Sequence, residues 1–306
     1  MRVLRGFSSA VSTPTALTIG NFDGVHRGHV VLLERLVNTA REKGLLPAVL
    51  TFEPHPREFF MPDSAPARLT ILREKLELIA ACGIDTVMIC AFNADFATLT
   101  AESFIERVLL KSLATKHLLI GDDFRFGKGR GGDFALLQDA GQKRGFTVEA
   151  MSAVIVEGER VSSSVVRKVL AAGDMERAIA FLGRPYIIDG RVIHGDKIGR
   201  RLGFNTANIH IRHFQLPMTG VFAVEVEGLE NRMLRGVANL GIRPTRGGER
   251  PLLEVHLFDF DRFIYGAHLS VRFVHKLRDE QRFPDFDALK AQIARDAVAA
   301  RNFFKF

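Results

Sequence analysis

Apolar and polar positions alternate along the first part of the chain in a way that predicts strands and helices in turn. A short apolar run over residues 16–19 ends in a turn that contains Gly20, Asn21 and Gly24, and apolar residues then recur at helical spacing up to Val37. A second apolar run follows over residues 45–52. Strand, helix and strand in this order form a βαβ unit, which calls for a parallel sheet with a right-handed crossover.

The pattern changes after Gly183, Arg184 and Pro185, which break a predicted helix. Before this break the spacing predicts further helices over 70–81, 101–113, 135–144 and 175–182, and further strands over 86–91, 117–120 and 148–156. After it, short apolar runs predict strands over 186–193, 221–226, 233–239, 252–258 and 268–273, and a last helix over 285–301. Repeated short strands without helices between them are typical of a small antiparallel barrel. We therefore predict two domains, residues 1–183 with a parallel α/β sheet and residues 184–306 with a barrel.

Composition narrows the class of protein. The chain of 306 residues carries a net charge of +7, but its positive residues are dispersed, so small polyanions explain the excess as well as nucleic acid does. We expect no nucleic-acid partner. Cys82 and Cys90 cannot make a disulfide framework and point to a reducing cytoplasm. No run of eighteen apolar residues occurs, so we expect a protein that is neither exported nor in the membrane.

The turn after the first predicted strand is a candidate phosphate site, because it leaves backbone N–H groups and a helix N-terminus beyond the strand. His26 and His29 lie three residues apart in the opening turn of the helix and can face one ligand. Such donors suit attack on the α-phosphate of a nucleoside triphosphate. The alternatives are a capping histidine beside a solvated one, or a metal site, for which the ligand set is incomplete.

Later loops fall on the same edge of the predicted sheet. His55, between two prolines, either approaches the nucleotide or is exposed to water. Phe124 and Phe126 alternate, so that one ring is free for an aromatic ligand, unless both belong to the core. Residues 162–164 are serines that can cap the following helix, and Arg160 and Arg167 flank that helix start.

Four motifs, GNFDGVHRGH, TFEPHP, GDDFRFG and SSSVVR, resemble in order and spacing the adenylyltransferase half of prokaryotic bifunctional riboflavin kinase/FAD synthetases. This resemblance implies a Rossmann-like nucleotidylyltransferase domain in which His26 and His29 stabilise the α-phosphate of ATP. It implies flavin contacts at Asp122 and Phe124. It also implies nucleotide contacts at Gly20, Phe22, Asp23, Gly24, Gly28, Ser163, Ser164 and Arg167. Ser164 stands where many relatives have Thr and keeps the hydroxyl.

The second domain opens with a glycine-rich, basic stretch that can wrap a phosphate chain through Gly195, Lys197, Gly199 and Arg200. Three segments resemble the riboflavin kinase half of the same family: this glycine-rich stretch, GVANLGIRPT and LEVHLFDF. The resemblance implies that Thr206 and Asn208 bind Mg²⁺ and nucleotide phosphates, that Glu254 is the general base and that Arg278 contacts the flavin. Asn205 departs from the family, which usually has Pro there, and this puts kinase efficiency in doubt.

The predicted function is therefore phosphorylation of riboflavin by ATP to FMN, followed by adenylylation of FMN to FAD with release of pyrophosphate. The sequence leaves the oligomeric state open. One rival is an enzyme with a single active half. Another is a flavin-binding regulator that uses a degenerate enzyme fold. Class I aminoacyl-tRNA synthetases share the HxGH turn, but their second signature is not evident here.

Overall fold

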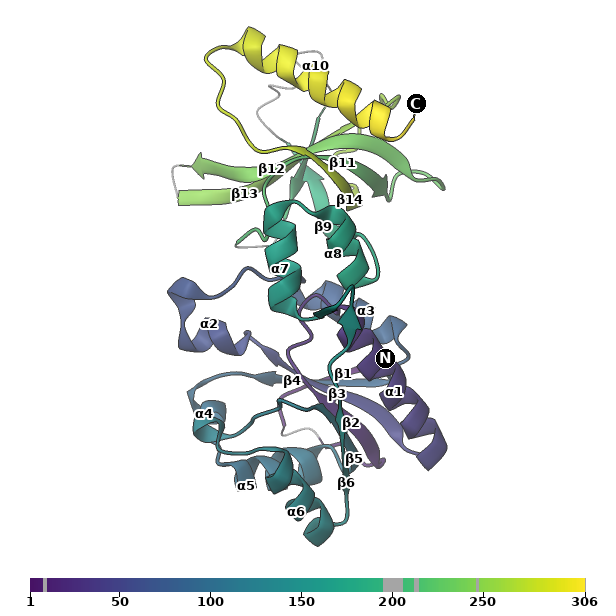
Figure 1. Ribbon diagram of the computed structural model, residues 1–306, viewed down its shortest axis with the longest axis vertical. Helices are drawn as coiled ribbons and strands as arrows, with labels where there is room; N and C mark the ends of the chain where they lie inside the picture. The colour runs from purple at the N-terminus through teal and green to yellow at the C-terminus, as the bar shows by residue number, and fades with distance from the viewer. Residues whose placement is uncertain (8–9, 195–205, 212–214, 246–247, 306) are drawn as a thin grey trace. The chain divides into compact units, whose positions relative to one another are not determined.

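The computed structural model describes residues 1–306 except 8–9, 195–205, 212–214, 246–247 and 306, and it leaves the side chains of 243–250 undescribed. The chain divides into two compact units, which are taken one at a time below (Figure 1). The first unit contains Met1–Pro66 and Leu72–Ser162, and the second contains Ala67–Ile71 and Ser163–Phe306. The predicted division at residue 183 remains a prediction. In the structure, α7 (Ser163–Ala172) and α8 (Met175–Leu182) belong to the second unit, where α8 packs on β9 (Tyr186–Ile193).

A six-stranded parallel sheet forms the centre of the first unit, as the βαβ pattern predicts. Its strand order is β1-β4-β3-β2-β5-β6. The strands are β1 (Arg2–Arg5), β2 (Thr15–Ile19), β3 (Leu46–Glu53), β4 (Thr86–Ala91), β5 (Thr115–Gly121) and β6 (Thr147–Met151). From β2 the chain moves outward to β3 and β4, and then returns to place β5 on the other side of β2. The strand order thus reverses between β2 and β5.

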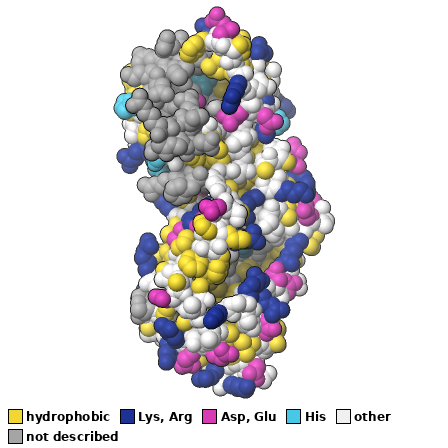
Figure 2. Space-filling model, turned by 90° about the vertical axis from the view of Figure 1, so that its left-hand side faces the viewer, with side chains coloured by type: hydrophobic (Ala, Val, Ile, Leu, Met, Phe, Trp, Pro, Cys, Tyr) yellow, Lys and Arg dark blue, Asp and Glu magenta, His cyan; other side chains and the backbone are white. Residues whose placement is uncertain are grey.

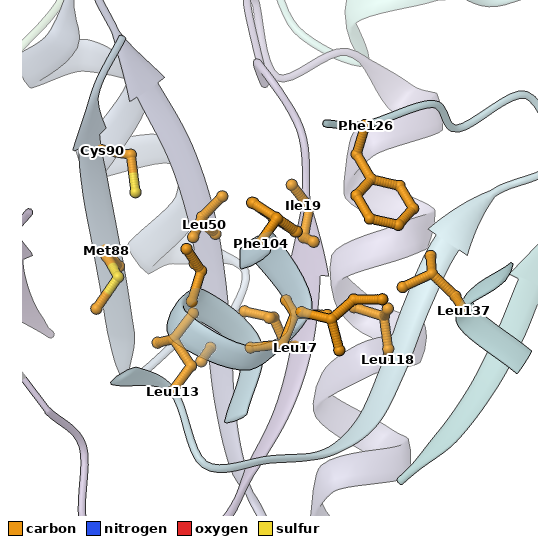
Figure 3. Close-up of a cluster of buried hydrophobic side chains, with 14 of the residues drawn as sticks. Leu17, Ile19, Leu50, Met88, Cys90, Phe104, Leu113, Leu118, Phe126 and Leu137 are labelled. Carbon is orange, nitrogen blue, oxygen red and sulfur yellow. The ribbon is translucent and has the colours of Figure 1, made fainter. Parts of the chain in front are cut away.

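Helices cover both faces of this sheet, because neighbouring residues of each strand point to opposite faces. In β2, for example, Leu17 belongs to one buried cluster and Ala16 to the other. Figure 3 shows the first cluster, in which Phe104 and Leu113 pack onto strand residues such as Leu17. The helices of this unit are α1 (Arg27–Lys43), α2 (Pro56–Phe60), α3 (Leu72–Ala81), α4 (Ala94–Ala97), α5 (Ala101–Phe104) and α6 (Phe134–Arg144), with 3₁₀ turns at η1 (Pro62–Ser64) and η3 (Lys128–Arg130).

The second unit contains a closed six-stranded barrel of order β10-β13-β12-β11-β14-β9 with antiparallel pairing, as predicted. Its other strands are β10 (Ala207–His210), β11 (Gly220–Glu227), β12 (Leu234–Thr245), β13 (Gly248–Leu257) and β14 (His268–Arg278). The last helix, α10 (Phe286–Phe303), packs on β11, β12 and β14. Side chains that point into the barrel, such as Leu253 and Val255, are fully buried.

The structure differs locally from the predicted elements at four places. The sequence analysis missed β1, a short edge strand in which only Leu4 is buried, and β10, which lies inside the glycine-rich stretch. The strand predicted over 148–156 ends at Met151, and a separate hairpin of β7 (Ile155–Val156) and β8 (Glu159–Arg160) follows. The helix predicted over 101–113 continues after α5 as a π-helix, η2 (Ile105–Ser112). Among the described residues, no helix is long and apolar enough to cross a membrane.

Candidate active sites

The reversal of strand order between β2 and β5 marks where a ligand is expected. In open parallel sheets, ligands bind beyond the carboxyl ends of the strands at such a point. The chain leaves β2 directly into the turn of residues 20–26, and it leaves β5 into residues 122–127. The topology therefore brings the HxGH motif and the GDDFRFG motif to one edge of the sheet.

The turn after β2 has an unusual backbone that the core stabilises. Phe22, Gly24 and Val25 all have positive φ, at 49°, 81° and 37°. For two residues with large side chains this is strained. The Phe22 and Val25 side chains are each only 1% exposed, so their burial stabilises the turn. The predicted nucleotide contact of Phe22 is thereby restricted to its backbone, since its ring belongs to the core.

His26 combines the capping role with a place in the site. It is the N-cap of α1, and its Nδ1 accepts a hydrogen bond from the backbone N–H of His29 at 3.3 Å. The two imidazole rings stack with centroids 3.6 Å apart and planes 14° apart. Gly28 provides the space, because a Cβ there would lie 3.2 Å from two ring atoms of His26. The capping alternative is thus correct for His26, but its partner is not a solvated histidine.

The His29 ring lies between the His26 ring and the Phe22 ring, with centroids 3.6 and 5.0 Å away. Its Nδ1 is buried and has no hydrogen-bond partner in the described part of the chain. Burial lowers the pKa of His29 well below 6.5, and the charges of His26 and Lys75 lower it further. His29 is therefore a neutral imidazole near neutral pH, which can donate one hydrogen bond to an anion.

Asn21 is a site residue that the sequence analysis did not single out. Its Oδ1 is buried and, across the residues that the structure describes, it has no hydrogen-bond partner. Its backbone oxygen accepts a hydrogen bond from Thr51 Oγ1 at 3.3 Å, which ties the turn to β3. Buried polar atoms are almost always paired in folded proteins. Two unpaired atoms in one turn, Asn21 Oδ1 and His29 Nδ1, indicate a place for a ligand. The only sequence signal was the position of Asn21 between two glycines.

The loop after β5 separates the two predicted ring positions. Phe126 is buried in the core, whereas Phe124 is half-buried and stacks on it with centroids 5.7 Å apart. Asp122 is exposed and lies 3.6 Å from Arg160, which also pairs with Asp123 at 3.0 Å. Phe124 is thus the ring that a ligand can reach. Arg160, which flanks the predicted phosphate site, forms ion pairs within its own unit.

Three predicted nucleotide contacts belong to the second unit. Ser163 and Ser164 are the first residues of α7, and Arg167 lies one turn further along. The Arg167 Nε donates to the Ala67 carbonyl at 2.6 Å. Their contact with the nucleotide remains a prediction. In the first unit, the His55 Nδ1 caps α2 by accepting from the Arg57 N–H at 3.1 Å.

An exposed aromatic cluster near the ends of β3 and β4 was not anticipated. Phe59, Phe60 and Phe92 lie edge to face, with ring centroids 5.2–5.6 Å apart. Phe60 is 62% exposed, which is unusual for so large an apolar ring. The pair of phenylalanines just after the Pro-His-Pro turn was the available signal. Exposed apolar surface of this kind is common at binding sites.

On the barrel, pairing brings three polar residues from three strands into one row. Asn208 of β10 lies opposite Glu254 of β13, and Glu254 lies opposite Asn239 of β12. Directly opposed residues of antiparallel strands have Cβ atoms about 5 Å apart. Leu253 and Val255 point into the barrel, so this row is on its outer face, where all three residues are half-buried. The predicted base and a predicted metal ligand are thus neighbours, and Asn239 is a third member that the sequence did not reveal.

The remaining predicted kinase residues are only partly described. Gly195, Lys197, Gly199 and Arg200 lie outside the described residues, as does Asn205. Thr206 is described and precedes β10. Among described residues, no three His, Cys, Asp or Glu side chains converge where they could hold a metal ion. The hydroxyl of Thr206, the amide oxygen of Asn208 and the carboxylate of Glu254 are nevertheless donors of the kind that suit a hard cation such as Mg²⁺.

Arg278, the predicted flavin contact, forms an ion pair with the last helix. Its Nε and Nη2 donate to the two carboxylate oxygens of Asp296 at 2.9 and 2.7 Å, and its Nη1 donates to the Asp279 carbonyl at 2.8 Å. Asp296 is 5% exposed and also accepts from Gln292 at 2.8 Å. Most of the Arg278 donors are therefore used within the protein. Its contact with flavin remains a prediction.

Charged side chains of both signs lie on the surface. Figure 2 shows one face, on which Lys and Arg side chains are spread out with Asp and Glu between them. Arg262 and Arg301, for example, pair with Glu230 and Asp259.

Comparison with known proteins identifies the family. A family model described as FAD synthetase matches residues 8–165, and one described as riboflavin kinase matches residues 182–304. The bifunctional riboflavin kinase/FMN adenylyltransferase of Escherichia coli strain K12 is 50% identical over 99% of this chain and 98% of its own. The proteins of the same name from Haemophilus influenzae and Pseudomonas fluorescens are 47% and 49% identical, over 99% and 93% of this chain and 99% and 91% of their own.

Among solved structures, one described as a macrolide-efflux protein from Streptococcus pneumoniae is 28% identical, with a TM-score of 0.86 over 99% of both chains. It supports the fold over the whole length. The two domain matches and the full-length relatives confirm the resemblance found in the motifs. The chain therefore belongs to the bifunctional riboflavin kinase/FMN adenylyltransferases, enzymes that use ATP to convert riboflavin to FMN and FMN to FAD.

Proposed function

We propose that adenylyl transfer takes place at the turn after β2 and that riboflavin is phosphorylated on the outer face of the barrel around Glu254. The unpaired, buried His29 Nδ1 carries the first assignment. The row of Asn208, Glu254 and Asn239 carries the second. The domain limits of 1–183 and 184–306 are part of this proposal; the two family matches cover residues 8–165 and 182–304.

In adenylyl transfer, a phosphate oxygen of FMN forms a bond to the α-phosphorus of ATP, and the bond from that phosphorus to pyrophosphate breaks. No protein nucleophile is needed, so positioned donors supply the catalysis. The neutral His29 donates its Nδ1–H to a phosphoryl oxygen, and the stacked His26 holds the His29 ring in place. The N-terminus of α1 adds backbone N–H groups. Phe124 and the exposed Phe59 and Phe60 offer ring surfaces for the flavin.

In the kinase reaction, Glu254 accepts the proton of the primary ribityl hydroxyl while that oxygen attacks the γ-phosphorus and ADP departs. Thr206 and Asn208 would hold Mg²⁺, which when bound neutralises phosphate charge. Asn239, opposite Glu254, can orient the carboxylate or a ribityl hydroxyl through its amide. A cytoplasmic location, suggested by two free cysteines, remains a prediction.

The test separates the two reactions in the full-length protein. Riboflavin, ATP and Mg²⁺ are incubated with His29→Ala, Glu254→Ala or the exposed control His210→Ala, and flavins are followed by chromatography. His29→Ala should lower the rate of FAD formation about 10²–10³-fold and spare FMN formation, because one charge-stabilising donor is lost. Glu254→Ala should stop FMN formation but leave conversion of supplied FMN to FAD. A folded variant that loses both reactions would overturn the assignment.

A further inference from the structure

A second carboxylate, that of Glu280, lies on the same outer face of the barrel as Glu254. Glu280 follows the end of β14, and its side chain crosses onto β12, where it rests on the backbone of Gly241. A Cβ at position 241 would lie 2.7 Å from Glu280 Oε2 and closer still to Oε1. Gly241 has no positive φ in this strand, so the glycine is explained by the space that the carboxylate occupies.

Strand register relates this position to the proposed base. Gly241 pairs with Leu252, and Asn239, two residues earlier on the same face of β12, pairs with Glu254. Diagonal neighbours on one face of a sheet are about 7 Å apart, within reach of long side chains. The register thus places the two carboxylates on one face. Although Glu280 is exposed as a residue, partial burial of its carboxylate raises its pKa, while the charge of Arg278 lowers it and that of Glu254 raises it.

The nearby cations are engaged with other acids. Arg278 makes its two-pronged ion pair with Asp296, and Lys276 pairs with Asp279. Glu280 itself is exposed, and no hydrogen bond or ion pair to its carboxylate occurs among the residues that the structure describes. Within the described part of the chain, no ion pair therefore neutralises the charge of Glu280.

We propose, on the basis of the kinase function proposed above, that Glu280 selects flavins by charge: it admits neutral riboflavin and repels the phosphorylated product. Riboflavin carries only hydroxyls on its ribityl chain, and a carboxylate accepts hydrogen bonds from hydroxyls. FMN carries a phosphate dianion at the reacting oxygen. An unneutralised carboxylate near that end raises the free energy of bound FMN more than that of bound riboflavin. Glu280 thereby favours product release and limits product inhibition.

The experiment measures product inhibition by FMN in full-length protein. The His29→Ala background keeps added FMN from being consumed, and initial rates of FMN formation from labelled riboflavin are measured against unlabelled FMN. Glu280→Gln keeps the size of the side chain and removes the charge. The inhibition constant of FMN should fall about fivefold relative to the KM of riboflavin, as expected for screened, exposed charges. Glu225→Gln, a half-buried glutamate on the outer face of β11, is the matched control and should leave this ratio unchanged.

A second measurement varies the salt concentration. Higher ionic strength screens the repulsion, so FMN should become a relatively stronger inhibitor of the Glu280 protein, while the Glu280→Gln protein should respond less. An unchanged ratio of inhibition constant to KM in Glu280→Gln, or an equal salt response in both proteins, would overturn the proposal. Failure of the kinase assignment is distinguishable, because FMN formation would then survive Glu254→Gln.

Discussion

The two proposed sites are built in opposite ways. The site after β2 is one continuous stretch of ten residues, Gly20 to His29, in which a strained turn and two stacked imidazoles lie against the core. The site on the barrel collects Asn208, Asn239, Glu254 and Glu280 from positions far apart in the chain. Strand register makes the first three neighbours, and the path of the chain after β14 brings Glu280 beside them. The first site depends on local backbone geometry, whereas the second depends on the barrel as a whole.

This difference predicts that damage to barrel packing should affect only one of the two reactions. In Asp296→Ala the buried partner of Arg278 is removed. Loss of one member of a buried ion pair typically costs about 3–5 kcal/mol of the free energy of unfolding. Tyr186 and Tyr265, the only tyrosines, both lie in the second unit and the chain has no tryptophan, so tyrosine fluorescence during urea unfolding reports on that unit. Its transition should shift strongly, and FMN formation should fall.

The control for this prediction is Arg232→Ala in the same unit, which breaks the surface pair of Arg232 and Glu230. An exposed pair contributes about 0–1 kcal/mol, so this variant should unfold almost as the parent does. Conversion of supplied FMN to FAD should continue in Asp296→Ala. Equal loss of both reactions at temperatures where the protein stays folded would contradict the contrast between the two sites.

The same contrast explains what the sequence could predict. The motif of Gly20 to His29 could be interpreted from the sequence, because its spacing sets which groups meet. The buried, neutral state of His29, in contrast, follows only from packing. The proximity of Asn239 and Glu280 to Glu254 could not be found, because it depends on the pairing of β12 with β13 and on the path of the chain after β14. The exposure of Phe59 and Phe60 could not be predicted either, because it depends on the packing around them.

The glycine within the HxGH motif tests how tightly the first site is built. In Gly28→Ala the new Cβ would lie 3.2 Å from the His26 ring, which must move by a few tenths of an ångström. Because small displacements of catalytic groups are costly, FAD formation from FMN should fall about tenfold, with FMN formation unchanged. Steady-state rates of the two reactions check this. Val31→Ala, an exposed change in the same helix, should alter neither rate, and a Gly28→Ala protein with the parental FAD rate would show that the ring position is not critical.

The smallest expected effect is on the pH dependence of stability, and it concerns the first unit. The pKa of His29 in the folded protein lies below its ordinary value of 6.5, so below that pH the unfolded chain binds a proton that the folded chain does not. The contribution of neutral His29 to the free energy of unfolding is therefore complete above about pH 6.5. It is lost as the pH falls toward the folded pKa, by at most about 1.4 kcal/mol per pH unit. Urea unfolding of the parent and His29→Gln, followed by far-UV circular dichroism at about pH 7.5 and 5.5, measures the difference. His117, whose pKa burial also lowers, is common to both proteins and cancels. An equal loss of stability in the two proteins would contradict the lowered pKa of His29, because the folded protein would then bind the same proton at about pH 5.5 as the unfolded chain does.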